Sequence, residues 1–215
     1  MMQLYRLFGK RRSWFLTGRG VRHKNYSSYD EYLAHQKAKL SSIKNLDKKW
    51  ERLKTCLHER LADIPEVRRG ANCLCLGARL GAEVEAFIDF GVFAIGIDLN
   101  PGKDNRYVVT GDFHHVQYAE ASIDVIYTNS LDHVFNLKEV LAEVLRLLKP
   151  SGLFIVDLIH GSKDAHGRDP GYFASSWWDH SDEMIREISA TGLAVHRQRE
   201  FVEPWAGIQA IFRKP

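Results

Sequence analysis

The feature that most constrains the fold is a regular alternation of short apolar runs and helix-length segments between residues 72 and 158. Strands that alternate with helices of this length indicate βαβ units and a mostly parallel sheet covered on both faces. We expect strands at Cys73–Leu76, Phe93–Asp98, Tyr107–Val109, Asp124–Tyr127 and Leu153–Leu158, and helices at Gly81–Asp89 and Leu137–Lys149.

The segments on either side complete the predicted architecture. Residues 28–61 place apolar side chains three and four positions apart, which predicts N-terminal helices with a break near Asn45. After the alternating core, a helix near Asp182–Thr191 precedes two apolar runs that we expect to pair as antiparallel strands at the sheet edge. The predicted fold is therefore α/β, a doubly wound mixed sheet that is mostly parallel with an antiparallel edge strand, preceded by an N-terminal helical segment.

The length of 215 residues and the hydrophobic content of 45% suffice for one well-buried domain. We expect a basic arm at 1–27 and a single domain at 28–215. Within the domain we assign 28–66 to N-terminal helices, 71–158 to the ligand-binding core and 159–215 to a lid and the C-terminal edge. No apolar run reaches about 18 residues, so no membrane span is expected.

The positive charge is concentrated in the N-terminal arm. Residues 1–29 contain seven Lys or Arg and no acid, whereas the whole chain has a net charge of only +3. Aromatic and apolar residues are interleaved with these charges, so weak contact with an anionic surface is one interpretation and an extension lying on the domain is the other. We expect no stable binding to nucleic acid, and the sequence leaves the oligomeric state open.

The cysteines and histidines give no metal or disulfide pattern. Cys73 and Cys75 lie on one face of an apolar strand, which favours burial, and Cys56 stands apart from them. The ten histidines have no recognisable ligand spacing. We therefore expect no metal, and a reducing cytoplasm as the compartment.

Candidate ligand-binding residues follow the predicted strands, because ligands of open α/β sheets lie beyond the carboxyl ends of the strands. The first strand ends in "LGARLGAE", whose glycines permit a tight turn before a helix, although the spacing fits a dinucleotide loop poorly. The second ends at Asp98, which can accept hydrogen bonds from both ribose hydroxyls, with Leu99 placed to cover an adenine face. The third is followed by Asp112, suited to an adenine amino group, and by Phe113, which can stack.

In this order the motifs "GARLGAEVEAF", "GIDLNPG", "GDFHH" and "LKPSGLF" resemble class I S-adenosylmethionine-dependent methyltransferases, and in particular a subgroup with G-A-R in the glycine loop. The resemblance covers residues 72–158 and implies a Rossmann-like sheet with S-adenosyl-L-methionine as cofactor and S-adenosyl-L-homocysteine as product. It implies that the loop lines the methionine part of the cofactor, that Asp98 binds ribose and that the remaining residues flank adenine or close the site. The implied cofactor residues are Gly77, Ala78, Arg79, Gly81, Asp98, Leu99, Asp112, Phe113 and Asn129.

Arg79 departs from the wider family, which usually has glycine at this position. The cofactor carries a carboxylate where a dinucleotide carries phosphates, and a guanidinium can clamp a carboxylate through two hydrogen bonds. The alternative is that Arg79 points to solvent or pairs with Glu83.

We expect methyl transfer to a small-molecule acceptor such as a sugar, a lipid or a secondary metabolite. A general base would follow the fourth strand, where His133 is the candidate, oriented by Asp132 or Asp157; alternatively His133 only caps a helix or packs beneath the lid. The N-P-P-Y type signature of enzymes that methylate amino groups in nucleic acids is absent, because Asn129 is followed by Ser130 and Leu131. We therefore do not expect methylation of nucleic-acid bases. A non-catalytic cofactor-binding or interaction module of the same fold is the alternative function.

Overall fold

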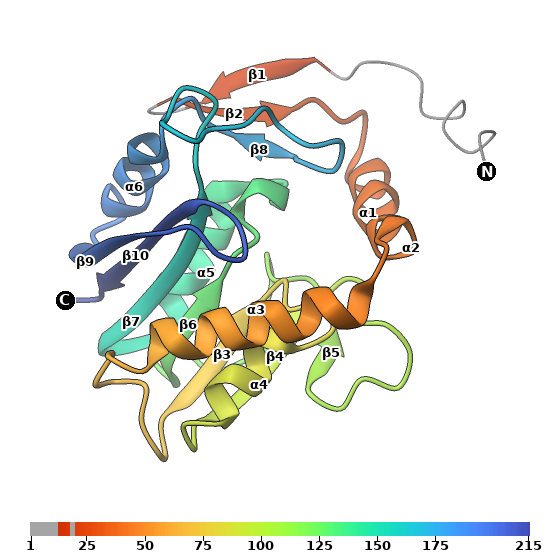
Figure 1. Cartoon of the computed structure of the whole chain (residues 1–215). Coiled ribbons are helices and arrows are strands. Elements are labelled where there is room, and N and C mark those ends of the chain that lie inside the picture. The colour runs from red at the N-terminus through yellow and green to blue at the C-terminus, as the bar shows by residue number, and fades with distance from the viewer. Residues whose placement is uncertain (1–12, 18–19) are drawn as a thin grey trace.

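The computed structural model describes residues 13–17 and 20–215, and a seven-stranded sheet runs through its centre (Figure 1). The strand order is β5-β4-β3-β6-β7-β10-β9, parallel from β5 to β7 and antiparallel at β7–β10 and β10–β9. The predicted mixed sheet and its antiparallel C-terminal edge are confirmed. The strands are β3 (Asn72–Leu76), β4 (Phe93–Asp98), β5 (Val108–Thr110), β6 (Ile123–Thr128), β7 (Leu148–Ile159), β9 (Ala194–Phe201) and β10 (Gly207–Arg213).

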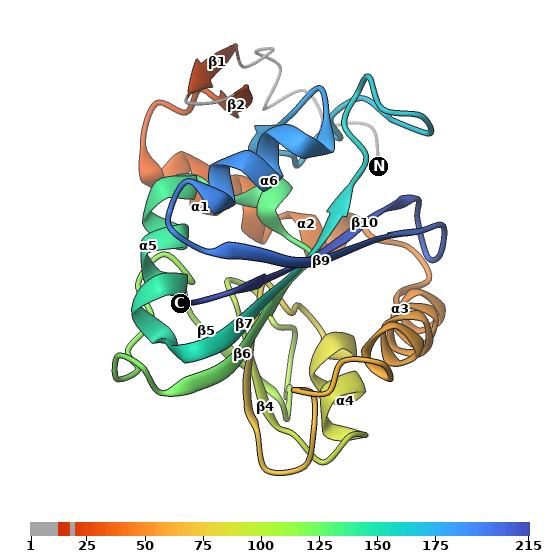
Figure 2. The ribbon, with the colours of Figure 1, turned by 90° about the vertical axis from the view of Figure 1, so that its left-hand side faces the viewer.

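Helices cover both faces of this sheet (Figure 2). α3 (Leu46–Leu61) and α4 (Ala82–Ile88) pack on one face, and α5 (Leu137–Leu147) and α6 (Ser181–Ser189) pack on the other. Strand β6 shows why three apolar residues follow one another: Val125 and Tyr127 belong to the core beneath α3 and α4, whereas Ile126 belongs to the core on the α5 side. A central strand buried on both faces has no position left for a polar alternation.

The N-terminal helices are divided where the sequence predicts it. α1 (Tyr29–Lys37) begins at Ser28, whose Oγ accepts from the backbone N–H of Glu31 at 3.2 Å. After the short α2 (Lys39–Ser42), Asn45 adopts a left-handed conformation with φ of 55° and starts α3 in a new direction. This turn leaves α1 and α2 over the carboxyl ends of the central strands.

A second, three-stranded sheet has the order β1-β2-β8 and was not predicted. It pairs β1 (Trp14–Thr17) and β2 (Val21–Lys24) from the arm with β8 (Ser176–Trp177) from the predicted lid. Strands of two and four residues carry too little alternation to be recognised in a sequence. Residues 1–12 and 18–19 of the arm lie outside the described residues, so the division into arm and domain stays a prediction.

A buried ion pair fixes α3 to the sheet. Arg60 donates to Asp157 at 2.6 Å, and their side chains are 8% and 0% exposed. Asp157 also accepts from Tyr127 at 2.7 Å and from Gln209 at 2.8 Å. These contacts commit Asp157 to the core, so it is not the group that orients His133. Among the described residues, no helix is long and apolar enough to span a membrane.

Candidate cofactor and active site

A narrow cavity of about 50 Å³ lies at the carboxyl ends of β3, β4 and β6, beneath α1 and α2. Six of the predicted site residues line it, and the N-terminal helices add four more side chains that the sequence reasoning missed. The predicted residues are Gly77, Arg79, Asp98, Leu99, Phe113 and His133, and the additional ones from the helices are Tyr32, Gln36, Lys39 and Leu40.

The loop after β3 requires glycine at its first position. Gly77 has a φ of 70°, and a Cβ there would lie 2.7 Å from the side chain of Ser130. Ala78 is buried against Gly96, and Gly81 begins α4 with a φ of 89°. Ala78 and Gly81 therefore shape the loop from behind, because neither lies among the residues that line the cavity.

Asp98 joins this loop to the end of β4. One carboxylate oxygen accepts from the backbone N–H of Arg79 at 2.9 Å, and the other accepts from that of Asn100 at 2.8 Å. Each oxygen keeps lone-pair capacity for a ligand, because a carboxylate offers about four acceptor positions. Asp98 is thus held in place while its side chain faces the cavity.

Arg79 takes a left-handed conformation with φ of 45°, and its side chain lines the cavity. Within the described residues, its guanidinium makes no hydrogen bond or ion pair, including with Glu83. This arrangement leaves the guanidinium free to bind a carboxylate, as the clamp hypothesis requires.

Asp112 stands beside the cavity and is bound within the protein. Tyr29 of α1 donates to one oxygen, and the backbone and ring nitrogens of His114 lie 2.9 and 2.6 Å from the other. Burial alone would raise the pKa of Asp112, but the hydrogen bonds of His114 hold it below its ordinary value. Phe113 faces the cavity, whereas the contact of Asp112 with adenine stays a prediction.

A chain of polar contacts links α4 to the end of β6. Asn129 donates to Glu83 at 2.8 Å and accepts from Ser130 at 3.0 Å, and Ser130 reaches the carbonyl of Gly77 at 3.3 Å. Burial raises the pKa of Glu83 to about 7, although Asn129 and Arg79 favour the charged form. Asn129 therefore supports the glycine loop without lining the cavity itself. Its contact with the cofactor stays a prediction.

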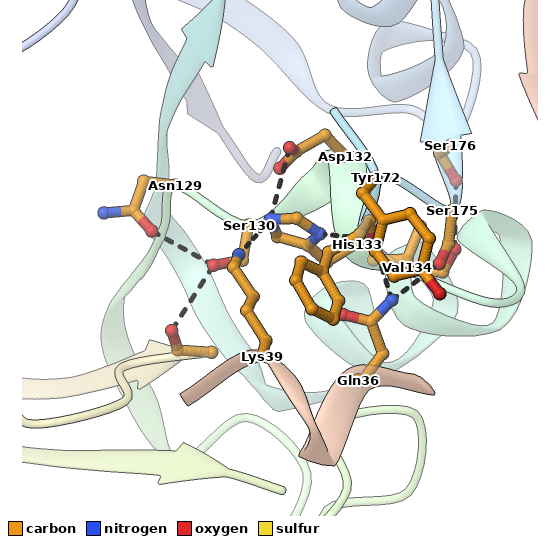
Figure 3. A network of polar contacts seen from close by, with 12 residues as sticks. Gln36, Lys39, Asn129, Ser130, Asp132, His133, Val134, Tyr172, Ser175 and Ser176 are labelled. Atoms are coloured by element: carbon orange, nitrogen blue, oxygen red, sulfur yellow. Dashed lines mark hydrogen bonds and ion pairs between the residues drawn. The ribbon is translucent and has the colours of Figure 1, made fainter. Parts of the chain in front are cut away.

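Lys39 and His133 meet across the cavity, with Asp132 beside them (Figure 3). The ring Nδ1 of His133 lies 2.9 Å from the carbonyl of Phe173, so Nδ1 carries the hydrogen and Nε2 presents its lone pair to Lys39. Asp132 lies 3.3 Å from the same Nε2. His133 thus occupies the predicted place, but it is oriented by a backbone carbonyl rather than by Asp132.

The pKa values of both basic groups, His133 and Lys39, are lowered. Burial lowers the pKa of His133 to about 4, with the charge of Lys39 acting in the same direction. Burial and the charge of Arg79 lower the pKa of Lys39 to about 8, against the opposing effect of Asp132 and Asp98. At neutral pH the imidazole is therefore unprotonated and a weak proton acceptor, and of these two groups the amine has the pKa closer to neutrality.

The aromatic residues of the lid divide between core and surface. Trp177 and Trp178 are each 1% exposed and stack on each other, which makes them part of the core. Tyr172 is exposed and contacts His35 of α1. Within residues 13–17 and 20–215, no group of three or more His, Cys, Asp or Glu side chains could hold a metal ion.

Comparison with known proteins identifies the family that the central part of the chain resembles. Residues 74–156, which carry the loop, Asp98 and the polar chain at β6, match the methyltransferase domain family. This match covers 83 of the 215 residues and agrees with the predicted resemblance to class I S-adenosylmethionine-dependent methyltransferases. The predicted cofactor, S-adenosylmethionine, agrees with this match.

Two curated relatives are similar to part of this chain. The sterol 4-C-methyltransferase strm-1 of Caenorhabditis elegans is 30% identical over 119 residues, which are 48% of this chain and 36% of the relative. The 24-methylenesterol C-methyltransferase 2 of Oryza sativa subsp. japonica is 30% identical over 113 residues, 45% of this chain and 31% of the relative. The chain thus matches about a third of the length of these relatives.

Solved structures confirm the fold. The 1,6-didemethyltoxoflavin-N1-methyltransferase of Burkholderia thailandensis, solved with S-adenosylhomocysteine, superimposes with a TM-score of 0.65 over 94% of this chain and 99% of that protein. Its sequence is only 16% identical, so the similarity concerns the fold and not the acceptor.

Proposed function

We propose that this protein transfers the methyl group of S-adenosylmethionine to a small organic acceptor, of the lipid or metabolite kind that the sterol-methylating relatives make plausible. The observation that most supports this proposal is that the Gly77 loop, Asp98 and Phe113 line one cavity at the carboxyl ends of neighbouring strands. The free cysteines Cys56, Cys73 and Cys75 accord with a reducing cytoplasm as its compartment.

The side chains fit the cofactor part by part. Asp98 would accept from the ribose hydroxyls, Leu99 and Phe113 would cover the adenine faces, and Arg79 would bind the carboxylate of the methionine portion. Gly77 would let the backbone approach closely, because no Cβ fits beside Ser130. When bound, S-adenosylmethionine supplies a methyl group on a positively charged sulfur, and the protein mainly has to align the acceptor with it.

Space for the cofactor requires α1 and α2 to withdraw. The cavity of about 50 Å³ is far smaller than the roughly 300 Å³ at which small-molecule sites begin. Lys39 lines this cavity. Gln36 links α1 to the segment after β7 through the carbonyl of Phe173 at 2.9 Å and the hydroxyl of Ser175 at 2.8 Å. We propose that these contacts open when the cofactor enters and close again over it.

Where the acceptor must lose a proton, Lys39 rather than His133 acts as the general base that accepts it. A lysine with a pKa of about 8 is neutral in part of the molecules at pH 7, and a nearby sulfonium would favour the neutral amine further. His133, neutral and held by Phe173, would position the amine through Nε2.

The function is tested by measuring S-adenosylhomocysteine release from S-adenosylmethionine with a panel of sterol, fatty-acid, sugar and aromatic acceptors. Acceptor-dependent release that is lost in Asp98→Asn supports the proposal. Binding of S-adenosylhomocysteine without turnover on any acceptor would favour the non-catalytic module, and no binding would overturn the cofactor assignment for the whole chain.

A further inference from the structure

A second pocket lies on the other side of the glycine loop and has a volume of about 460 Å³. This volume falls within the roughly 300–1,000 Å³ of small-molecule sites. Its walls come from α3, the start of α4, Arg168 of the loop after β7 and the turn between β9 and β10. Figure 2 shows α4 and the β9–β10 turn next to α3. The pocket is therefore assembled from segments that are distant in sequence.

The lining combines apolar surface with positive charge. Trp50 of α3 and Trp205 of the β9–β10 turn supply aromatic faces, and further apolar contacts come from leucines and Pro204. Four cations line the same pocket, namely Lys49, Arg52, Arg79 and Arg168. Such a surface suits a ligand with an apolar body and a negative group.

The positive charge of the pocket is largely uncompensated. Arg52 is paired with Glu203, and Arg79 is assigned to the carboxylate of the cofactor, so Lys49 and Arg168 remain without a side-chain hydrogen bond or ion pair within the described part of the chain. The carboxyl group in the lining is Glu83, whose pKa burial raises to about 7, so that it is only partly ionised near neutrality. A ligand carboxylate or phosphate would supply the missing negative charge.

The pocket also adjoins the cavity assigned to the cofactor. Arg79 lines both spaces, and Arg168 is close enough to Lys39 for its charge to lower the pKa of that amine. A molecule in the pocket could thus reach the cavity where Lys39 and His133 meet. Arg79 would then separate the carboxylate of the cofactor from the negative group of the acceptor.

We propose that this pocket holds the methyl acceptor, and that the acceptor is a small amphipathic molecule with an anionic carboxylate or phosphate group. The inference rests on the proposed function, because the pocket is assigned to the acceptor through the wall that it shares with the cofactor cavity. It narrows the acceptor class from any lipid or metabolite to one that carries a negative charge.

Three naphthalene probes of similar size test the charge preference: 2-naphthoate, 2-naphthyl phosphate and the neutral 2-naphthamide. Their affinities are measured by calorimetry with and without saturating S-adenosylhomocysteine, in the parent protein and in Lys49→Gln, Arg168→Gln and the control Arg186→Gln on α6. Lys49, Arg168 and Arg186 are exposed, so each change removes one charge and leaves the core untouched.

With saturating S-adenosylhomocysteine, we expect at least one anion to bind about tenfold or more tightly than the amide, equivalent to roughly 1.4 kcal/mol. Lys49→Gln and Arg168→Gln should each lower the affinity for the anionic probe severalfold and leave the affinity for the amide unchanged. Arg186→Gln should change neither affinity. If 2-naphthoate binds more tightly, the acceptor carries a carboxylate; if 2-naphthyl phosphate binds more tightly, it carries a phosphate.

Equal binding of all three probes, no binding of any, or an anion preference that survives both pocket variants would overturn the proposal. The proposed function fails separately, through the absence of S-adenosylhomocysteine binding. Binding of S-adenosylhomocysteine without an anion preference leaves the methyltransferase function standing and removes only the anionic acceptor.

Discussion

Replacing Lys39 with methionine should stabilise the protein near neutral pH and have much less effect at pH 10. The amine of Lys39 contacts Nε2 of His133, and the positive charges of Arg79 and Arg168 repel the charged form of this amine. Burial and this repulsion lower its pKa from 10.5 to about 8, while Asp132 and Asp98 only partly offset them. The charged amine of Lys39 is therefore less favourable in the folded protein than in the unfolded chain.

The sign follows from proton linkage. Below pH 8 the amine is charged in both states, and the lowered pKa destabilises the folded protein by about 3 kcal/mol. At pH 10 the folded protein has already lost the proton, and the cost falls to about 1 kcal/mol. Loss of the hydrogen bond to His133 in Lys39→Met costs about 1 kcal/mol at either pH. The variant should therefore gain about 2 kcal/mol at pH 7 and almost nothing at pH 10.

Urea unfolding of the parent and Lys39→Met at pH 7 and pH 10 measures this difference directly. Lys37→Met is the control, because Lys37 is an exposed lysine at the end of the adjacent helix α1. The reasoning is refuted if the stability change of Lys39→Met is the same at both pH values, or if Lys37→Met shows an equal pH dependence.

Three further changes test other parts of the site and the core. Arg60→Met should lower the free energy of unfolding by about 3–5 kcal/mol, because it leaves the buried Asp157 without its ion-pair partner; urea unfolding that shows less than about 1 kcal/mol contradicts the burial of this pair. Arg79→Ala should weaken S-adenosylhomocysteine more than 5′-methylthioadenosine in calorimetric titrations, since only the former has a carboxylate to clamp; equal losses would remove Arg79 from that role. His133→Gln should keep most of kcat and the shape of its pH profile above pH 5, because burial lowers the pKa of His133 to about 4, whereas a roughly hundredfold loss of kcat would restore the histidine as general base.

Local signals in the sequence were enough to predict most of the sheet. Phe93–Asp98 is the strand that the sequence predicts, and the predicted break near Asn45 coincides with the start of α3. The glycine loop and Asp98 could be found because they follow strands whose boundaries are visible in the sequence.

The features that could not be predicted depend on contacts between distant residues. Lys39 is one of several lysines in a polar segment, and only the fold brings it to His133, 94 positions later. Arg60 and Asp157 are 97 positions apart, and neither shows in the sequence that it is buried. The small sheet of β1, β2 and β8 joins the N-terminal arm to the segment after β7 through strands of two to four residues.

The central claim is that the cavity at Asp98 binds S-adenosylmethionine, and calorimetric titration of S-adenosylhomocysteine and NAD tests it most directly. The titration compares the parent, Asp98→Asn and Asp104→Asn, which removes an exposed aspartate from the loop after β4. We expect the parent and Asp104→Asn to bind S-adenosylhomocysteine and not NAD, and Asp98→Asn to bind it at least about tenfold more weakly, from the loss of hydrogen bonds to a charged acceptor. An unchanged affinity in Asp98→Asn, with its unfolding transition intact, or a preference of the parent for NAD would contradict the claim.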